Sequence, residues 1–521
     1  MILGDPAAAA PQQGPRRLTI DEVFHRIAAK HPDRPALLDA PNRKAFTDAA
    51  PRRLTYAEAD RIVAAIAGRL HGMGMTTDSI VGIQLPNTVD NVLTLLGVLR
   101  AGLIAAPLPL LWRRAELVAA LGRLGAKALI TCGRIGSFNY CHSAMRAASE
   151  VFSIRYVCGF GDKLPDGIVR FDDLFAAETA DPVPPLERER RHDAASHIAF
   201  ITFDVGAGGI VPVARNHLEA IAGGLGVALE GRLAQNAGIV STIPPASFAG
   251  LSLTFIPWLL SAGTLSLHHP FDAAVLAQQR RDDDCSTLIV PDALALRLAE
   301  AGAFDGDVGG TVIAAWRAPE RLAASPIWPP RDTALVDVSI FGEAGLVAAR
   351  RGADGRATSI PFGPVTAPRG NPGAVVVAEL VRTAAGSVAL RGPMVPRHAF
   401  PPGIDRSGLA HFEIDRFGLV DTGYGCEVDP VSNAMVVTAP PSGLVGVGGY
   451  RFPLHDLQEA VGQIDRAANI APLPDPLLGQ RLVGHAGQRD AVQAALNAVG
   501  INPLVAAAFR DRGDRAESFG R

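Results

Sequence analysis

The chain has 521 residues, of which 48% are hydrophobic and 19% are charged, and its formal net charge is −3. This length exceeds what a single hydrophobic core usually serves, so we expect several domains. The small net charge argues against a nucleic acid or an anionic membrane as the partner and favours a small-molecule ligand.

Cysteines and apolar runs bear on the compartment. The 5 cysteines form no Cys-x-x-Cys pair and are odd in number, which fits a reduced, cytoplasmic protein with buried thiols. The sequence predicts no transmembrane helix, because it has no uninterrupted apolar stretch of about 18 residues. Residues 1–17 lack a basic start followed by a long apolar run, so we interpret them as a loose tail.

The first third of the chain alternates helix and strand patterns. Thr19 with Glu22, and Thr55 with Glu58, have the spacing of a capping box at the start of a helix. Alternating strands and helices without long interruptions predict a parallel sheet covered on both faces. The predicted strands include 79–85, 128–131, 153–158 and one that runs into Pro107, and the predicted helices include 89–101 and 114–124.

The second part begins after a segment rich in Pro, Glu and Arg at 180–192, which predicts an exposed linker. A strand over 197–203 leads into a glycine-rich loop at 204–213, and Asn216 with Glu219 predicts the next helix. Short strands between turns predict a small β-subdomain over 361–437. Glycines from 443 to 449 predict a flexible joint before the last segment.

These patterns predict an α/β fold with a large N-terminal domain and a small, mobile α+β C-terminal domain. The large domain is expected to combine two doubly wound α/β subdomains with the small β-subdomain. The predicted boundaries are a tail at 1–17, a large domain at 18–438 with subdomains 18–195, 196–360 and 361–438, and a C-terminal domain at 439–521.

The glycine-rich loop has the backbone of a phosphate site but not its side chains. Such loops bind polyphosphate through backbone amides, hydroxyl groups and a cation. Here Gly206, Gly208 and Gly209 are present, but no hydroxyl residue lies between Phe203 and Val213, and no lysine follows Lys163. Asp204 adds a carboxylate, which would repel phosphate by roughly 4 kcal/mol at about 4 Å in an effective dielectric near 20. A glycine turn that merely joins strand to helix is the competing interpretation.

Other short stretches follow in a recognisable order. Residues 244–251 contain an apolar turn, 316–319 read Trp-Arg-Ala-Pro, 339–345 place a glutamate after a predicted strand, and 415–424 end in Asp-Thr-Gly-Tyr. The side chains in these stretches that could form a site are Ser247, Phe248, Gly250, Trp316, Arg317, Ala318, Pro319, Phe341, Glu343, Asp421, Thr422 and Tyr424.

The order and framing of these motifs resemble the adenylate-forming superfamily, which includes acyl- and aryl-CoA synthetases, adenylation domains of peptide synthetases and luciferases. The resemblance covers the chain from Thr19 to about His485. It implies that ATP activates a carboxylic acid as an acyl adenylate, and that a thiol such as CoA or a carrier protein then accepts the acyl group. The resemblance also implies Mg²⁺ and ATP or AMP as cofactors.

The resemblance assigns a role to each motif. Glu343 becomes the metal ligand and, with Thr422, a catalytic candidate. Arg510 and Arg512 stand near the place of the family's C-terminal lysine, which acts mainly as a charge on the developing phosphate. The implied nucleotide contacts are Gly206, Gly208, Gly209, Ala318, Pro319, Asp421 and Tyr424, and the implied acid pocket is Ser247, Phe248, Gly250, Trp316, Arg317 and Phe341.

Several positions depart from the family pattern. Val213 replaces the lysine of the loop, Gly342 replaces the Thr before Glu343, and Trp316 and Arg317 replace two glycines. Tyr424 replaces the ribose-binding Asp, and a phenol offers a weaker contact to two hydroxyls than a carboxylate does. Two functions therefore stay open: an AMP-forming acid:thiol ligase with impaired activity, or a non-catalytic descendant that binds an acyl or aryl ligand, or a partner protein, in the same cleft. Either function is compatible with a homodimer.

Overall fold

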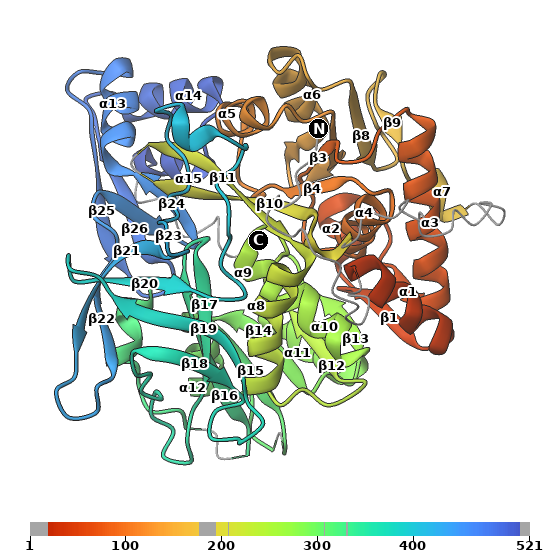
Figure 1. The fold of residues 1–521 in the computed structure, drawn as a ribbon. Helices are drawn as coiled ribbons and strands as arrows, with labels where there is room; N and C mark the ends of the chain where they lie inside the picture. Colours follow the sequence, from red (N-terminus) through yellow and green to blue (C-terminus); the bar gives the residue numbers. More distant parts are fainter. Residues whose placement is uncertain (1–18, 177–193, 207, 307, 330–331, 511–521) are drawn as a thin grey trace.

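The computed structural model describes residues 19–176, 194–206, 208–306, 308–329 and 332–510. It contains an eight-stranded, a seven-stranded, a five-stranded and a four-stranded sheet, with helices packed around them (Figure 1). The mixed α/β architecture with parallel sheets is the predicted one. The predicted tail at 1–17 and the predicted linker at 180–192 lie outside the described residues.

The seven-stranded sheet is formed mainly by the first third of the chain. Its order is β11-β10-β4-β3-β5-β8-β9, and its neighbours pair in parallel except β10 with β11. Crossover helices between its strands explain why the strands are parallel and buried. The strands are β3 (Ile80–Ile83), β4 (Ile104–Pro107), β5 (Ala128–Cys132), β8 (Tyr156–Phe160), β9 (Val169–Arg170), β10 (Ile198–Gly206) and β11 (Gly209–Asn216). The helices of this part are α1 (Ile20–Lys30), α2 (Arg43–Thr47), α3 (Tyr56–Gly72), α4 (Val89–Arg100), α5 (Arg114–Leu124), α6 (Tyr140–Glu150) and α7 (Asp173–Ala176), and a small ribbon is formed by β6 (Arg134–Ile135) and β7 (Phe138–Asn139).

The eight-stranded sheet joins the start of the chain to its middle. Its order is β17-β16-β15-β14-β12-β13-β1-β2, and the six strands from β16 to β1 run parallel. Its strands are β1 (Pro35–Asp39), β2 (Arg53–Thr55), β12 (Gly238–Ser241), β13 (Thr264–Leu267), β14 (Thr287–Pro291), β15 (Thr311–Trp316), β16 (Ala334–Phe341) and β17 (Gly345–Arg350). Its helices are α8 (His217–Glu230), α9 (Phe248–Gly250), α10 (Ile256–Ser261), α11 (Ala273–Asp282) and α12 (Asp292–Glu300).

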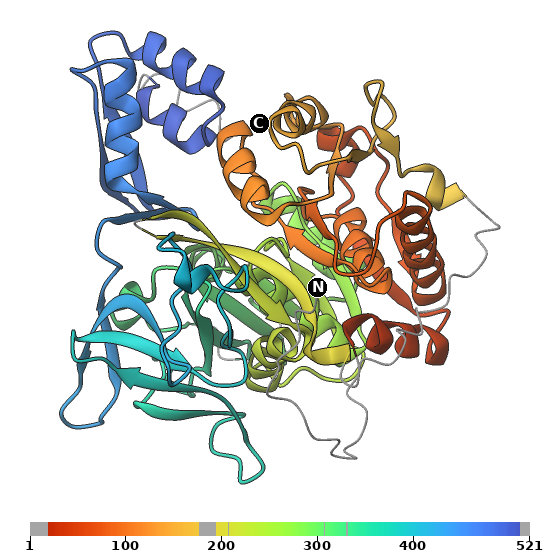
Figure 2. The ribbon, with the colours of Figure 1, turned by 45° about the horizontal axis from the view of Figure 1, so that its top comes forward.

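Two antiparallel sheets follow. The predicted β-subdomain is formed by β18 (Gly363–Ala367), β19 (Val375–Arg382), β20 (Ser387–Arg391), β21 (Val420–Val428) and β22 (Met435–Ala439). The C-terminal segment, defined here as residues 443–510, contains β23 (Leu444–Val447), β24 (Tyr450–Pro453), β25 (Asn469–Asp475), β26 (Gly479–His485), α13 (Leu454–Ile464), α14 (Arg489–Val499) and α15 (Pro503–Ala506). It has a hydrophobic core of its own and lies beside α5 (Figures 1 and 2).

Local sequence signals explain where several helices begin. The capping boxes predicted at Thr19, Thr55 and Asn216 are all formed, with the side chain of each cap accepting from the backbone amide three residues later. Each box satisfies amides that the first helical turn cannot pair by itself. The predicted helix over 114–124 has these bounds in the structure.

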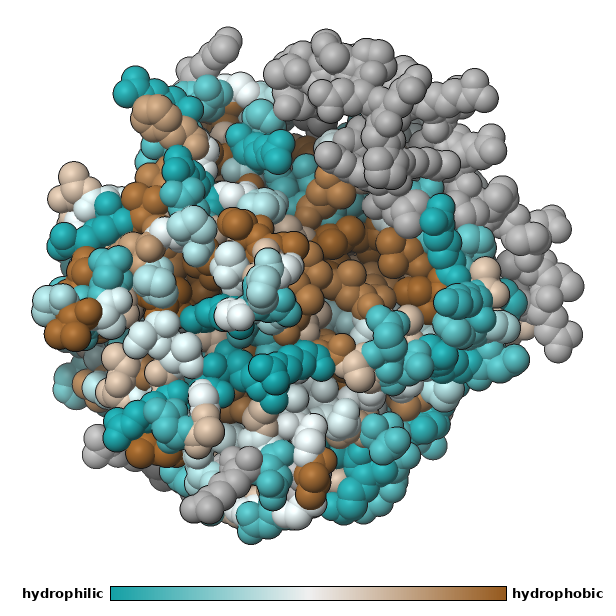
Figure 3. Space-filling model, turned by 60° about the horizontal axis from the view of Figure 1, so that its bottom comes forward, coloured by the Kyte–Doolittle hydropathy of each residue, from teal (hydrophilic) through white to brown (hydrophobic). Residues whose placement is uncertain are grey.

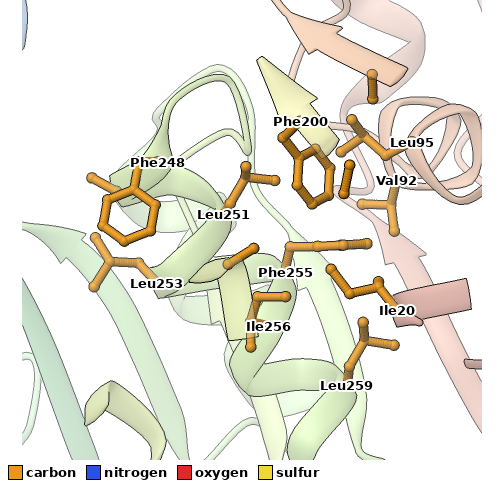
Figure 4. Close-up of a cluster of buried hydrophobic side chains, with 14 of the residues drawn as sticks. Ile20, Val92, Leu95, Phe200, Phe248, Leu251, Leu253, Phe255, Ile256 and Leu259 are labelled. Atoms are coloured by element: carbon orange, nitrogen blue, oxygen red, sulfur yellow. The ribbon is translucent and has the colours of Figure 1, made fainter. Parts of the chain in front are cut away.

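The largest buried cluster joins both parallel sheets. In Figure 4, Phe200 of β10 and Phe255 meet side chains of α4 and Ile20 of α1. Trp258 is fully buried beside Phe24 and Tyr56. Each fully buried side chain of this size contributes about 1.5–3 kcal/mol to the free energy of folding. The buried cluster therefore holds the two parallel sheets in a fixed relation. All five cysteine thiols are buried, as expected.

The sequence interpretation was wrong for two glycine-rich stretches. The predicted loop over 204–213 is a β-hairpin, because β10 continues to Gly206 and β11 begins at Gly209. The predicted joint over 443–449 is likewise not a loop, because it contains β23 and the turn at Gly448 and Gly449 that leads to β24; its flexibility stays a prediction. Both glycines have positive φ, which a two-residue hairpin turn of the favoured twist requires.

The surface adds two observations. Figure 3 shows apolar side chains gathered in a hollow near the middle of one face, with hydrophilic side chains along its lower rim. Within the described ranges, no helix combines the length and the apolar character needed to cross a membrane.

Candidate functional site

The candidate site lies where strands of the eight-stranded sheet end. Because the strands are parallel, their carboxyl ends share one edge, and open α/β sheets bind ligands at such an edge. Phe341 ends β16, Trp316 ends β15, and the loop with Ser247 and Phe248 follows β12. One face of β10, from the other parallel sheet, adds Thr202 and Asp204, which point the same way because they are two residues apart.

Glu343 is the centre of a buried polar cluster. Its carboxylate accepts from the Thr202 hydroxyl, from Arg215 Nη1 at 3.4 Å, and from the Phe248 backbone amide at 3.2 Å to each oxygen. Arg215 also donates to the carbonyl of Glu343, and its guanidinium lies 3.8 Å from the centre of the Phe248 ring. The side chains of Arg215 and Glu343 are 1% and 6% exposed.

The charges of this pair depend on one another. Burial raises the pKa of the Glu343 carboxyl, while the positive charge of Arg215 and the hydrogen bond from Thr202 oppose that shift. Burial likewise lowers the pKa of Arg215, and Glu343 opposes that shift. Removing either side chain would leave the other as an uncompensated buried charge.

A second polar cluster connects β10 and β21 to the C-terminal segment. Arg451 of β24 donates from Nη1 to Asp204 at 3.0 Å and from Nη2 to the Tyr424 hydroxyl at 2.7 Å. The Tyr424 hydroxyl in turn donates to the carbonyl of Arg317 at 3.3 Å. Burial raises the pKa of Tyr424, and the charge of Arg451 opposes this shift.

Trp316 and Arg317 point in different directions. The Trp316 indole donates to Asp337 at 2.8 Å and belongs to a buried cluster with Trp328, away from Phe248 and Phe341. Arg317 instead donates from Nη1 to the carbonyl of Gly449 at 3.2 Å. The structure therefore directs Arg317 toward the C-terminal segment and places Trp316 in a buried core cluster.

The other pocket candidates surround the Glu343 cluster. Phe341 and Tyr424 meet edge to face with ring centres 5.5 Å apart. Ser247 caps the short helix α9 by accepting from the Gly250 amide at 3.1 Å. A Cβ at Gly250 would collide with the carbonyl of Pro244, so this position admits only glycine without rearrangement.

The remaining nucleotide candidates are dispersed. Asp421 accepts from the Ser387 hydroxyl at 2.9 Å, and Thr422 donates to the carbonyl of Val388 at 2.6 Å, so both side chains bind within their own sheet. Ala318 and Pro319 begin a 3₁₀ turn after β15. Gly206, Gly208 and Gly209 lie in the hairpin of β10 and β11, where a Cβ at Gly208 would lie 2.5 Å from Ala410. Arg510 is exposed at the end of the described chain, and Arg512 lies outside the described residues.

Sequence reasoning missed four residues of the site, which are Thr202, Arg215, Arg451 and Asp292. Arg215 and Arg451 carry no motif that marks them, although Arg451 directly follows the Gly448-Gly449 turn. Asp292 begins α12 at the carboxyl end of β14, and burial raises its pKa from 3.8 to about 6 against the pull of Arg321 and Arg317. Perturbed carboxyls at a sheet edge are typical of functional sites.

The residues around Glu343 do not fit a magnesium ion as they are placed. Mg²⁺ needs free oxygen ligands in an octahedral arrangement, and both carboxylate oxygens already accept hydrogen bonds. Among the residues that the structure describes, no group of three or more His, Cys, Asp or Glu side chains is placed to hold a metal ion. The local positive charge comes from Arg215 instead.

Comparison with known proteins identifies the family. The model of a family described as AMP-binding enzyme matches residues 24–325, more than half of the chain. The chain therefore belongs to the AMP-binding family, which is the adenylate-forming superfamily that its motifs resemble.

Matches to curated proteins are local. The salicyl-AMP ligase / salicyl-S-ArCP synthetase of Mycobacterium tuberculosis is 32% identical over 170 residues, 32% of this chain and 29% of that protein. The 4-coumarate-CoA ligase 1 of Narcissus pseudonarcissus is 26% identical over 149 residues, 29% of this chain and 24% of that protein. The matched stretches thus span less than a third of the length of these relatives.

Solved structures match over nearly the whole chain. The amide bond synthetase McbA from Marinactinospora thermotolerans has a TM-score of 0.69 and 17% identity, covering 93% of this chain and 94% of the other. Mycobacterium smegmatis MbtA has a TM-score of 0.62 and 20% identity, covering 94% and 90%. At these identities the likeness establishes the fold, which is the predicted adenylate-forming fold.

Proposed function

We propose that the protein activates an acyl or aryl carboxylic acid as its adenylate and transfers the acyl group to a thiol, either CoA or a carrier protein. Membership of the AMP-binding family supports the first half of this reaction. Two matched relatives are named as ligases, one forming salicyl-AMP and one joining 4-coumarate and CoA, which favours an aromatic acid.

One observation carries the proposal. The loop after β12, the turn after β16 and one face of β10 meet at Glu343, as shown by its contacts with Phe248 and Thr202. This arrangement is what a cleft for an activated acid requires, because reacting groups must be held together while charge develops. Phe248 and Phe341 are the proposed acid-pocket side chains, and Arg317 is the proposed cation facing the acid.

The proposed reaction has two steps and needs no oxidant or reductant. A carboxylate oxygen attacks the α-phosphorus of ATP, the bond to pyrophosphate breaks, and the thiol later attacks the acyl carbon so that AMP leaves. Arg317 would act as a cation beside the acid and the α-phosphate, in place of the absent loop lysine. The proposed nucleotide residues, including Tyr424, then serve only after Arg451 leaves its present contacts.

The same two clusters are also compatible with a second candidate, which the named relatives do not favour. Glu343 is engaged by Thr202, Phe248 and Arg215, and Tyr424 is engaged by Arg451. These contacts suit a protein that binds an acyl or aryl ligand, or a partner protein, without using ATP. In that case the cleft would keep its apolar wall of Phe248 and Phe341 but perform no adenylation.

Two measurements distinguish the candidates. Calorimetric titration with Mg-ATP, together with pyrophosphate release over a panel of aromatic and aliphatic acids, tests adenylation. Thioester formation from a preformed acyl adenylate tests transfer separately. Acid-dependent pyrophosphate release supports the ligase. Binding of an acid without nucleotide binding, turnover or thioester formation supports the second candidate and contradicts the ligase.

An assignment of the acid-binding residues needs a matched control. Arg317→Met should weaken acid binding, whereas Arg466→Met, at an exposed arginine of the C-terminal segment, should leave it unchanged. Equal acid affinity in Arg317→Met and the unmodified protein would remove Arg317 from the acid site.

A further inference from the structure

Four departures from the family pattern meet at one hairpin, formed by β23 and β24. Asp204 stands in the former phosphate loop, Tyr424 in the place of the ribose-binding Asp, Arg317 in the former glycine turn, and Gly342 before Glu343. Positions that would line one nucleotide site are expected to lie close together, so the informative observation is which groups they contact. Here all of them contact Arg451 or its neighbour Gly449.

The guanidinium of Arg451 fits between three of these positions. It donates to Asp204 and to Tyr424 from different nitrogens, and a Cβ at Gly342 would collide with it. A lysine would offer a single nitrogen to both acceptors, whereas the planar guanidinium places two separate nitrogens in a fixed geometry. Glycine at 342 thus serves two requirements, its φ of +59° and the close approach of Arg451.

The fourth position, Arg317, contacts the turn of the same hairpin. Arg317 donates to the carbonyl of Gly449, and any side chain at Gly449 would collide with Arg317. The adjacent Tyr450 accepts from the backbone amide of Leu111 at 3.1 Å. The hairpin of β23 and β24 is therefore held by both parallel sheets.

More contacts align the C-terminal segment with α5. The amide of Asn502 donates to Glu116 at 2.7 Å, the amide of Ala115 donates to the carbonyl of Gly500 at 3.0 Å, and Arg114 donates to the carbonyl of Val499 at 2.9 Å. These bonds are local to the segment's outer end. Arg451 links the segment to Asp204 and Tyr424, which stand at positions where the family binds nucleotide.

We propose that Arg451, Asp204 and Tyr424 form a clasp that holds the C-terminal segment closed over the cleft, and that nucleotide enters only when this clasp opens. The side chains of Arg451 and Asp204 are 18% and 21% exposed, so water reaches the pair and a competing anion can displace Asp204. The first part of the proposal, that the clasp holds the segment closed, is called the closing half and does not depend on the proposed ligase activity. The second part, that nucleotide enters only when the clasp opens, is called the entry half and rests on the proposed function.

Hydrogen exchange on the full-length protein tests the closing half without any activity assay. Arg451→Met and Asp204→Asn should each speed exchange of the amides of β23 and β24 by at least roughly tenfold, because each removes one partner of a partly buried charge pair. The matched control Arg466→Met should exchange like the unmodified protein. Equal slow exchange in all four proteins would overturn the clasp.

A swapped pair separates the clasp from general destabilisation. Asp204→Arg combined with Arg451→Asp should restore slow exchange relative to either single reversal, since opposite charges again face each other. Failure of the swapped protein to recover, with its other regions exchanging normally, would contradict a direct pairing of these residues.

Nucleotide titration tests the entry half. Arg451→Met should bind Mg-ATP more tightly than the unmodified protein, by roughly tenfold or more if the clasp must open first. Equal, weaker or absent binding in the variant would overturn the entry half. Absent binding together with fast exchange in Arg451→Met would show that the clasp exists while the proposed adenylation fails.

Discussion

Two arginine–carboxylate contacts in this protein have similar chemistry and different surroundings. Arg215 and Glu343 are 1% and 6% exposed, whereas Arg451 and Asp204 are 18% and 21% exposed. In each pair, one member also bonds a hydroxyl group. Glu343 accepts from Thr202, and Arg451 donates to Tyr424.

The difference lies in what each contact joins. Arg215 and Glu343 bind elements already fixed by the shared core, so their pair belongs to the folded state itself. Arg451 and Asp204 are 247 residues apart and connect the C-terminal segment to β10. A fully buried pair costs more to break than a partly buried one, in which another anion can replace the carboxylate. The Arg215–Glu343 contact is therefore expected to stay formed in the folded protein, whereas the Arg451–Asp204 contact can open and close.

The largest expected effect comes from breaking the buried pair. Glu343→Ala should lower the free energy of unfolding by about 3–5 kcal/mol, because it leaves Arg215 charged and unpaired in the core. Urea denaturation followed by tryptophan fluorescence measures this loss. Glu379→Ala is the matched control at an exposed pair with Arg391, and it should cost less than about 1 kcal/mol. Similar losses in the two variants would contradict the distinction between buried and exposed pairs.

A carboxyl at the same edge extends the comparison to pH. Burial raises the pKa of Asp292 in the folded protein to about 6, so the stability linked to its protonation is present below about pH 4 and lost as pH rises through 6. Asp292→Asn should therefore be more stable than the unmodified protein at pH 8 by about 1–2 kcal/mol, with little difference near pH 4. Melting temperatures across this range measure the effect, and a pH-independent difference would contradict the raised pKa.

Substituting Trp316 tests whether this side chain belongs to the core or to the predicted acid pocket. Trp316→Phe should lower stability by about 1 kcal/mol, because it removes the indole hydrogen bond to Asp337 while Arg351 still pairs with that carboxylate. Acid binding by calorimetry should not change. Altered acid preference in Trp316→Phe would place this side chain in the pocket instead.

The smallest expected effect is the salt response of the exposed contact. Raising NaCl from about 0.1 M to about 1 M should weaken the Arg451–Asp204 coupling, measured by a double-mutant cycle, by at most about 1 kcal/mol. The coupling between Arg215 and Glu343 should change less, because water and ions do not reach it. Equal salt responses would remove the contrast between the two contacts.

Sequence reasoning predicted much of the fold because the relevant signals are local. The capping boxes at Thr19, Thr55 and Asn216, and the helix over 114–124, depend on contacts within one turn of helix. Glycine-rich stretches were misread, since glycine permits a loop and a tight hairpin equally well. Only strand pairing across 206–209 and 447–450 distinguishes the two.

The candidate site was predicted in part. In the structure the Phe248 amide donates to Glu343 and Phe341 packs on Tyr424, while the role of these residues in a site stays a prediction. Their partners Arg215 and Arg451 have no local signature, because a long side chain selects its partner only after the sheets and the C-terminal segment have packed. The direction of Trp316 was equally undetermined, since a residue at a strand end can face either the cleft or the core.

By itself, the sequence determined the family, the parallel α/β architecture and the absence of a loop lysine, because periodicity, caps and composition are properties of the chain alone. Only the tertiary structure decided how the altered positions are used. Asp204, Tyr424, Arg317 and Gly342 are far apart in sequence, and packing brings all four to the hairpin that carries Arg451.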